Sequence, residues 1–256
     1  MFNLIKAEMY KSFRRLYSKV FLAVTGGGVI LLNVLLSVIN RNVNGSTFTR
    51  SEMLIVYMVC LAIGMYLAIV TTDLVFSDEY KHGTLKNTVA FGYTRTEIYF
   101  SKLISACVIT VLMALLIVFI AVVTCWPLFE SDAAEVRTLG LFLEYALAVT
   151  PLWLSQVALS VAVWANVKNS NFGAVFVALF TAMAPGVLDI AAMITEKPIF
   201  SDIADILPAS QFSEYQSLTD ISEIVTLFPR FSVIGVSFFV GFALLGWLAF
   251  YKREIK

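Results

Sequence analysis

Six long apolar runs constrain the fold of this chain more than any other feature. They lie at about residues 20–39, 53–76, 101–126, 140–164, 173–194 and 231–251. Crossing about 30 Å of hydrocarbon takes about 20 mostly apolar helical residues, a length that each run reaches. A backbone surrounded by lipid must satisfy its own hydrogen bonds, and an α-helix does so. The runs therefore predict an all-α integral membrane protein with six transmembrane helices.

The composition is that of a membrane protein. Of the 256 residues, 59% are hydrophobic and 14% are charged, whereas a soluble domain has roughly a quarter charged residues. The formal net charge is zero, which gives no reason to expect a nucleic-acid partner. Cys60, Cys107 and Cys125 lie within apolar runs and are interpreted as packing residues. We treat residues 1–256 as a single transmembrane domain.

The basic residues predict how the spans are oriented. With both termini in the cytoplasm, 13 of the 18 basic residues fall on the cytoplasmic side. The other five are Arg41, Arg50, Arg137, Lys197 and Arg230. Cytoplasmic loops of membrane proteins are enriched in lysine and arginine. The sequence therefore predicts a multi-pass protein of the cell membrane with both termini in the cytoplasm.

Residues 1–19 are expected to form an amphipathic helix in the headgroup layer of the membrane. Its apolar residues recur every three or four positions, at Phe2, Ile5, Met9, Phe13, Leu16 and Val20. The cations Lys11, Arg14 and Arg15 fall mostly on other faces, where they would lie near anionic lipid. The pattern leaves open whether this helix also contacts a cytoplasmic partner.

Two prolines and one long loop are expected to interrupt the regular spans. Pro151 in the fourth run and Pro185 in the fifth predict a kink or a break in each helix. Residues 195–230 form the longest connection, on the predicted outer side. Long loops without secondary structure are rare in compact domains, so this one is expected to contain short amphipathic helices.

The residues needed for catalysis are missing from the sequence. His82 is the single histidine, which excludes a zinc site built on two histidines. The glycines at 26–28 lack the Lys-Ser/Thr that completes a nucleotide-binding loop, so another chain would have to bind any ATP. We therefore expect neither an enzyme nor a resident cofactor or metal. Asn33, Asp73 and Asp189 are candidate polar groups for a transport path or for helix packing.

The most polar segment, residues 77–100, is predicted to form an elbow between the second and third spans. Gly83 permits a sharp turn, and Thr84 can cap a short helix over residues 84–91. Gly92 is expected to end that helix. Reversing the chain needs only a short turn, so the extra helix requires a functional reason.

The start of the third span is also predicted. Thr94 and Glu97 fit the capping-box pattern, in which each residue satisfies a backbone N–H group of the other. The cations that follow, Arg95 and Lys102, are interpreted as solvated cytoplasmic charges. The elbow is thus expected to be a rigid unit in which a short helix, with a turn on each side, connects the second span to the third.

The elbow resembles that of ABC transporter type-2 permeases. The similar residues are Glu79-Tyr80-Lys81-His82-Gly83-Thr84-Leu85-Lys86-Asn87, Gly92-Tyr93-Thr94-Arg95 and Ile98-Tyr99-Phe100-Ser101-Lys102. In that family an acidic residue, a Gly-Thr-Leu sequence and a Gly-x-x-Arg turn lead into the third span. The basic N-terminal helix, the six spans and the long outer loop before the last span are similar as well.

The resemblance implies that the short helix is a coupling helix seated on a cytoplasmic ABC ATPase subunit. The implied docking residues are Glu79, Tyr80, Lys81, His82, Gly83, Thr84, Leu85, Lys86, Asn87, Thr88 and Phe91. Two ATPase copies carrying ATP and Mg, with two permease subunits that are identical or paralogous, would form an exporter in a bacterial plasma membrane.

The substrate is less constrained than the architecture. Small members of the family export or expel amphipathic peptides, as in bacitracin or lantibiotic resistance, bacteriocin immunity and peptide-toxin secretion. The resemblance therefore implies peptide transport and antimicrobial peptide resistance. Sodium, drugs or lipids are alternative substrates. A membrane scaffold or sensor that recruits a cytoplasmic partner without moving a substrate is the alternative function.

Overall fold

The computed structural model describes residues 1–42, 48–82, 85–167, 170–212 and 224–252, with the backbone alone for 78–82, 85–87, 170 and 224–225. These residues are almost entirely helical, which confirms the all-α class. In chain order the helices are α1 Phe2–Arg14, α2 Leu16–Asn42, α3 Arg50–Cys60, η1 Leu61–Ile63, α4 Gly64–His82, α5 Leu85–Ala90, α6 Arg95–Cys125, α7 Glu135–Asn166, α8 Ser170–Thr195, α9 Ile199–Asp205 and α11 Ile224–Lys252.

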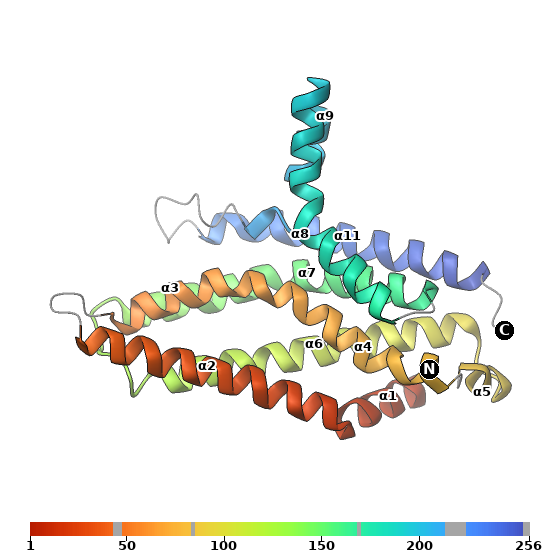
Figure 1. The fold of residues 1–256 in the computed structure, drawn as a ribbon, viewed down its shortest axis with the longest axis horizontal. Helices are drawn as coiled ribbons and strands as arrows, with labels where there is room; N and C mark the ends of the chain where they lie inside the picture. Colours follow the sequence, from red (N-terminus) through yellow and green to blue (C-terminus); the bar gives the residue numbers. More distant parts are fainter. Residues whose placement is uncertain (43–47, 83–84, 168–169, 213–223, 253–256) are drawn as a thin grey trace.

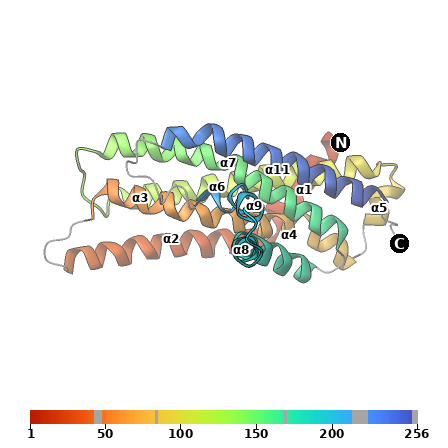
Figure 2. The ribbon, with the colours of Figure 1, turned by 90° about the horizontal axis from the view of Figure 1, so that it is seen from above.

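Within the described residues, six helical segments are long and apolar enough to cross a membrane, which confirms the predicted number of spans. They are α2, the α3–η1–α4 unit, α6, α7, α8 and α11. The bundle runs along the long axis of the molecule (Figure 1). The N-terminus, α5 and the end of α11 lie at one end of the bundle, and the connection from α6 to α7 lies at the other (Figures 1 and 2).

The two prolines have different effects on their helices. In secondary structure α7 continues through Pro151, and α8 continues through Pro185. However, α8 first follows the bundle and then turns away, so that its last part and α9 project out of the bundle (Figure 1). The fifth span is therefore bent, and the predicted break in the fourth span is absent from its described helix.

The second span contains a break that the sequence analysis did not predict. The 3₁₀ turn η1 separates α3 from α4, and the Nε1–H of Trp153 donates to the Leu61 carbonyl at 3.0 Å. The same carbonyl also accepts the Gly64 backbone N–H, so the indole adds a second hydrogen bond from a neighbouring helix at the break. Gly64 makes room for the indole, because a Cβ there would lie 2.6 Å from the Trp153 ring.

The core of the bundle is built around α7. Its fully buried side chains include Phe142, Tyr145 and Trp164. α11 packs along α7 at very short range, because a Cβ at Gly235 would lie 2.5 Å from the Pro151 backbone and one at Gly246 would lie 2.4 Å from the Ala162 Cβ. Small residues let membrane helices approach closely, and dispersion contacts then hold them together.

Polar contacts fix the end of the bundle that lies opposite α5. Arg50 at the start of α3 forms an ion pair with Glu135 at the start of α7, with 3.1 Å between Nη1 and Oε2. The Ser51 hydroxyl donates to Asp132, and this bond lowers the pKa of the Asp132 carboxyl. The connection from α6 to α7 is therefore tied to the start of the second span.

The long connection before the last span contains a short helix of the predicted kind. This helix is α9, Ile199–Asp205, and α11 begins at Ile224, several residues before the predicted sixth run. Residues 213–223 lie outside the described part of the chain.

Candidate functional site

A short helix lies between the second and third spans, at the position predicted for the coupling helix. α4 ends at His82, α5 occupies Leu85–Ala90 and α6 begins at Arg95. The predicted docking side chains from Glu79 to Asn87 lie outside the described side chains, and Gly83 and Thr84 lie wholly outside the described residues. Their roles stay predictions.

The tip of the elbow presents an aromatic side chain to the surroundings. Phe91 is 83% exposed, whereas Thr88 is half-buried. Gly92 has a φ of +88°, a conformation that side-chain-bearing residues rarely adopt, and its N–H donates to the Val89 carbonyl at 2.9 Å. Gly92 therefore ends α5 as predicted and leaves Phe91 at the surface.

The predicted capping box at the start of α6 is confirmed. The Glu97 backbone N–H donates to the Thr94 hydroxyl at 3.2 Å, and the Thr94 backbone N–H donates to the Glu97 carboxylate at 3.0 Å. Both bonds satisfy donors that a helix start leaves unpaired. The turn from α5 into α6 is thus fixed by its own residues.

A buried ion pair connects the N-terminal helix to the arms of the elbow. The Lys102 ammonium in α6 lies 3.2 Å from the Glu8 carboxylate in α1, and their side chains are only 3% and 7% exposed. Lys102 also donates to the Val75 carbonyl of α4 at 3.3 Å, and its ammonium lies 4.9 Å from the centre of the Phe76 ring. One charge pair therefore joins α1, α4 and α6.

The charge state of Glu8 is set by its neighbours. Burial raises the pKa of the Glu8 carboxyl, but the ammonium groups of Lys102 and Lys11 outweigh burial and hold that pKa below its ordinary range. Lys11 approaches the second carboxylate oxygen of Glu8 at 2.8 Å. Glu8 is therefore a carboxylate that bridges two ammonium groups at neutral pH.

The interpretation of Lys102 as a solvated charge is wrong, whereas Arg95 stays partly exposed at the surface. Lys102 is buried and ion-paired because α1 covers the start of α6. Arg95 donates to the Tyr251 carbonyl at 2.8 Å, where the last carbonyls of α11 have no helical partner. These two cations hold α6 against α1 at one side and against α11 at the other.

α1 packs with its polar face inwards. The residues that it buries are Glu8 and Ser12, whereas the apolar Phe2 and Phe13 are exposed. Two of the three predicted interfacial cations bind polar groups of the protein: Lys11 pairs with Glu8, and the Arg15 guanidinium donates to the Leu74 carbonyl at 2.5 Å. Arg14 alone of the three is exposed.

The sequence analysis missed Glu8, although two signals pointed to it. Glu8 is the only acidic residue among the first 51, and it lies in a helix that is otherwise basic. Lys102 lies at the beginning of a predicted span, where a charge is costly unless it is paired. These signals mark both charges as unusual, but they do not show that the two residues are in contact. We call Glu8, Lys102 and the backbone at Val75 the N-terminal clamp.

A comparison with known families decides which class of membrane protein this is. The sequence model of a family described as ABC-2 family transporter protein matches residues 4–185, well over half of the chain. The chain belongs to the ABC-2 transporter family. It is therefore a transmembrane permease component of an ABC transporter, and members of this family normally pair with an ATPase subunit. No curated protein sequence matches the chain.

The matched part of this ABC-2 permease begins in α1 and ends in α8. It therefore includes the N-terminal clamp, the elbow and the first four spans. The family is a membrane transport component and not a catalytic domain.

Asn33 is buried and hydrogen-bonded between helices of this permease. Its amide donates to the Thr124 hydroxyl at 2.7 Å, and its carbonyl oxygen accepts from the Tyr57 hydroxyl at 2.7 Å. The side chain is fully buried between α2, α3 and α6. Hydrogen bonds between helices stabilise membrane bundles, so this geometry supports the packing alternative for Asn33.

The two candidate aspartates lie in separate parts of the molecule. Asp73 is half-buried in α4, close to the residues that Arg15 and Lys102 contact. Asp189 is exposed in α8, after Pro185. A path lined by both has no support in the arrangement of this subunit.

Proposed function

We propose that this permease is the membrane-spanning subunit of an ATP-driven exporter whose ATP and Mg are bound by a separate cytoplasmic ATPase docked on α5. The proposal is supported by the way the arms of the elbow are held: α6 starts in a complete capping box, and both arms are joined to α1 through Glu8 and Lys102. A rigid element transmits displacement into the spans that continue from it, whereas a flexible loop would absorb it.

The docking proposal is tested with a matched pair of surface substitutions. Phe91 at the elbow and Val136 at the start of α7 are both 83% exposed, and they lie at opposite ends of the bundle. Aromatic anchors contribute roughly 2 kcal/mol or more to an interface, so Phe91→Asp is expected to reduce co-purification of the ATPase at least tenfold. Val136→Asp should leave co-purification unchanged. Equal recovery of the ATPase with both variants would refute docking at the elbow.

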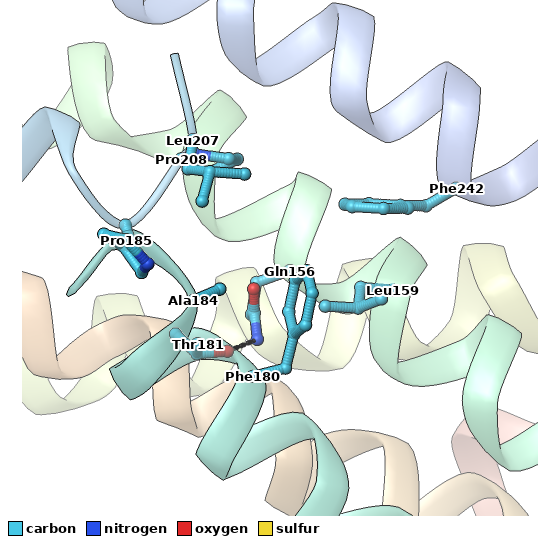
Figure 3. Close-up of a pocket in the computed structure, with 10 residues that line it drawn as sticks. Gln156, Leu159, Phe180, Thr181, Ala184, Pro185, Leu207, Pro208 and Phe242 are labelled. Carbon is cyan, nitrogen blue, oxygen red and sulfur yellow. Dashed lines mark hydrogen bonds between the residues drawn. The ribbon is translucent and has the colours of Figure 1, made fainter. Parts of the chain in front are cut away.

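The transport path is proposed to lie between two copies of the permease or between it and a paralogue. The interior of the described bundle is closely packed: the hollow at the base of the α8 bend has a volume of about 10 Å³, room for about one water (Figure 3). Gln156 and Thr181 are joined there by a hydrogen bond (Figure 3). A wide path through this one subunit has no support, and a symmetric pair is the simplest closed assembly.

Two differently tagged copies test this assembly. If the pair is identical, purification through one tag should recover the other tag together with the ATPase. Recovery of a single tag with a second, related permease would instead support a paralogous pair. Recovery of one permease with one ATPase would contradict a path between two permeases.

The proposed substrate is an amphipathic peptide of the toxin, lantibiotic or bacteriocin type. Support comes from the outer hollows of about 430 and 380 Å³, which are lined almost entirely by apolar side chains such as Phe176 and Phe239. Such surfaces suit a substrate that enters from the lipid. Amphipathic peptides should stimulate ATP hydrolysis by the assembled complex. Stimulation by sodium alone would refute the peptide substrate but leave the exporter in place.

A further inference from the structure

The outward face of α1 carries a regular pattern of aromatic and cationic residues. Phe2, Lys6, Tyr10 and Arg14 follow at intervals of four, which keeps them on one side of a helix. All four are exposed, because the opposite side of α1 carries Glu8 and is buried against the bundle. We call these four residues the α1 stripe.

The α1 stripe concentrates positive charge beside aromatic rings. The Lys6 ammonium lies 4.7 Å from the centre of the Phe2 ring, and the Arg14 guanidinium lies 4.7 Å from the centre of the Tyr10 ring. The single acidic residue of this helix, Glu8, is buried and paired on the other side. The stripe therefore offers two cations and two aromatic rings without a competing carboxylate on its own helix.

An apolar groove of about 680 Å³ begins next to the α1 stripe. Phe13 of α1 lines it together with Leu112 and Phe119 of α6 and Leu143 of α7. Its lining along α6 runs from Leu112 to Val122, roughly 15 Å at 1.5 Å per helical residue. The groove thus extends along the bundle, in the direction that an acyl chain follows in a membrane.

We propose that the α1 stripe and this groove bind an anionic phospholipid. Arg14, the neighbour of Phe13, binds the phosphate of the lipid whose acyl chain occupies the groove, and Lys6 binds an adjacent anionic headgroup. Positive side chains near a membrane surface attract anionic headgroups, and aromatic rings favour the same interfacial layer. This inference does not rest on the proposed transport function.

The position of the stripe favours lipid over a protein partner. The exposed apolar surface continues from α1 into α2 through Leu16 and Val20, which are 75% and 48% exposed. α2 is a membrane span, so the stripe lies where the hydrocarbon meets the headgroups.

The test measures which lipid the delipidated, full-length permease retains. Native mass spectrometry in a mild detergent, with equimolar dioleoylphosphatidylglycerol and dioleoylphosphatidylcholine, should show a preference for phosphatidylglycerol. The Lys6→Gln/Arg14→Gln variant should lose that preference by roughly fivefold for each cation removed. The matched control Arg41→Gln/Arg137→Gln removes two exposed cations near the opposite end and should retain it.

A second variant tests the groove itself. Leu112→Trp fills the groove without changing charge and should lower the amount of retained phosphatidylglycerol several-fold. Unchanged thermal unfolding without added lipid would show that the variants are folded. The proposal is overturned if the Lys6/Arg14 variant keeps its lipid preference, if the control loses the preference equally, or if the Lys6/Arg14 variant loses only its ATPase partner.

Discussion

At the scale of single residues, the pairing of Glu8 with Lys102 determines how α1 lies on the bundle. A buried charge is tolerated when its partner is close, and removing one partner costs about 3–5 kcal/mol. Glu8 has a second positively charged partner, because the Lys11 ammonium lies 2.8 Å from its carboxylate. The Lys102 ammonium is instead bonded to Glu8 and to the Val75 carbonyl. The two partners are therefore not equivalent, and their substitutions should differ.

We expect Glu8→Leu to destabilise the permease more than Lys102→Met. Glu8→Leu removes the carboxylate beside a buried lysine and should cost about 3 kcal/mol. Lys102→Met fills the same space with an apolar side chain and leaves Glu8 paired with Lys11, so its cost should be smaller. Thermal unfolding in detergent measures both, with the exposed Lys6→Met as the control. A larger loss for Lys102→Met would contradict this role of the pair.

The contribution of Glu8 should disappear in acid. Its pKa is lowered in the folded protein, so the unfolded state binds a proton more readily, and the stabilisation is complete above the ordinary glutamate range. The stabilisation should be lost as the pH drops below that range and passes through the lowered pKa. The measurement is the difference in Tm between the wild type and Glu8→Gln across pH 8 to 3. The pKa of Asp132 is also lowered, but its protonation changes the Tm of both proteins equally and cancels in the difference. A Tm difference between the two proteins that grows as the pH falls would contradict a lowered pKa for Glu8.

Residue-scale patterns that are local in sequence could be predicted, and long-range pairs could not. The Thr94–Glu97 capping box spans four residues and was predicted correctly. Thr49 and Glu52 have the same pattern and form the same box at the start of α3, although this was not predicted. Glu8 and Lys102 are 94 positions apart, with all of α2, α3, α4 and α5 between them, and the sequence alone does not show the packing that brings the two charges together.

At the scale of elements, the second span shows how a helix break is accommodated within a membrane. At the 3₁₀ turn η1 the Leu61 carbonyl accepts the Gly64 backbone N–H and also the Trp153 indole N–H, and Gly64 provides the space for the ring. Sequence reasoning placed interruptions at the prolines, since proline lacks the N–H that a helix uses. The break at η1 depends instead on a tryptophan from another helix, and a local pattern could not reveal it.

Gly64→Ala should therefore be costly. The added Cβ would lie 2.6 Å from the Trp153 ring, so the indole or the helix must move and the bond to Leu61 should weaken. Overpacking of this kind costs about 1–3 kcal/mol. Gly28→Ala is the matched control, because a Cβ at Gly28 would meet no atom within 4 Å, and it should be neutral or slightly stabilising. Equal Tm values for the two variants would show that the Trp153 contact does not constrain Gly64.

At the scale of the whole molecule, hydropathy and chain length predicted six spans correctly, because the transfer of each apolar run into lipid depends on that run alone. The bend of α8 and the projection of α9 were beyond sequence reasoning, because they depend on how α8 meets α7 and α4. The arrangement of the ends is consistent with an even number of crossings, since the N-terminus and the end of α11 lie together with α5 (Figure 1).

The side of the membrane that α5 faces remains a prediction, and cysteine labelling tests it. Cys60, Cys107 and Cys125 are replaced by alanine, and one cysteine is introduced at exposed Phe91 or Ala133, which lie on either side of α6. Because 13 of the 18 basic residues fall on the predicted cytoplasmic side, Ala133→Cys should react with an impermeant maleimide in intact cells and Phe91→Cys only in inverted vesicles. The reverse pattern would invert the topology and place the elbow beyond reach of a cytoplasmic ATPase. Reaction of both cysteines from one side would mean that α6 does not cross the membrane.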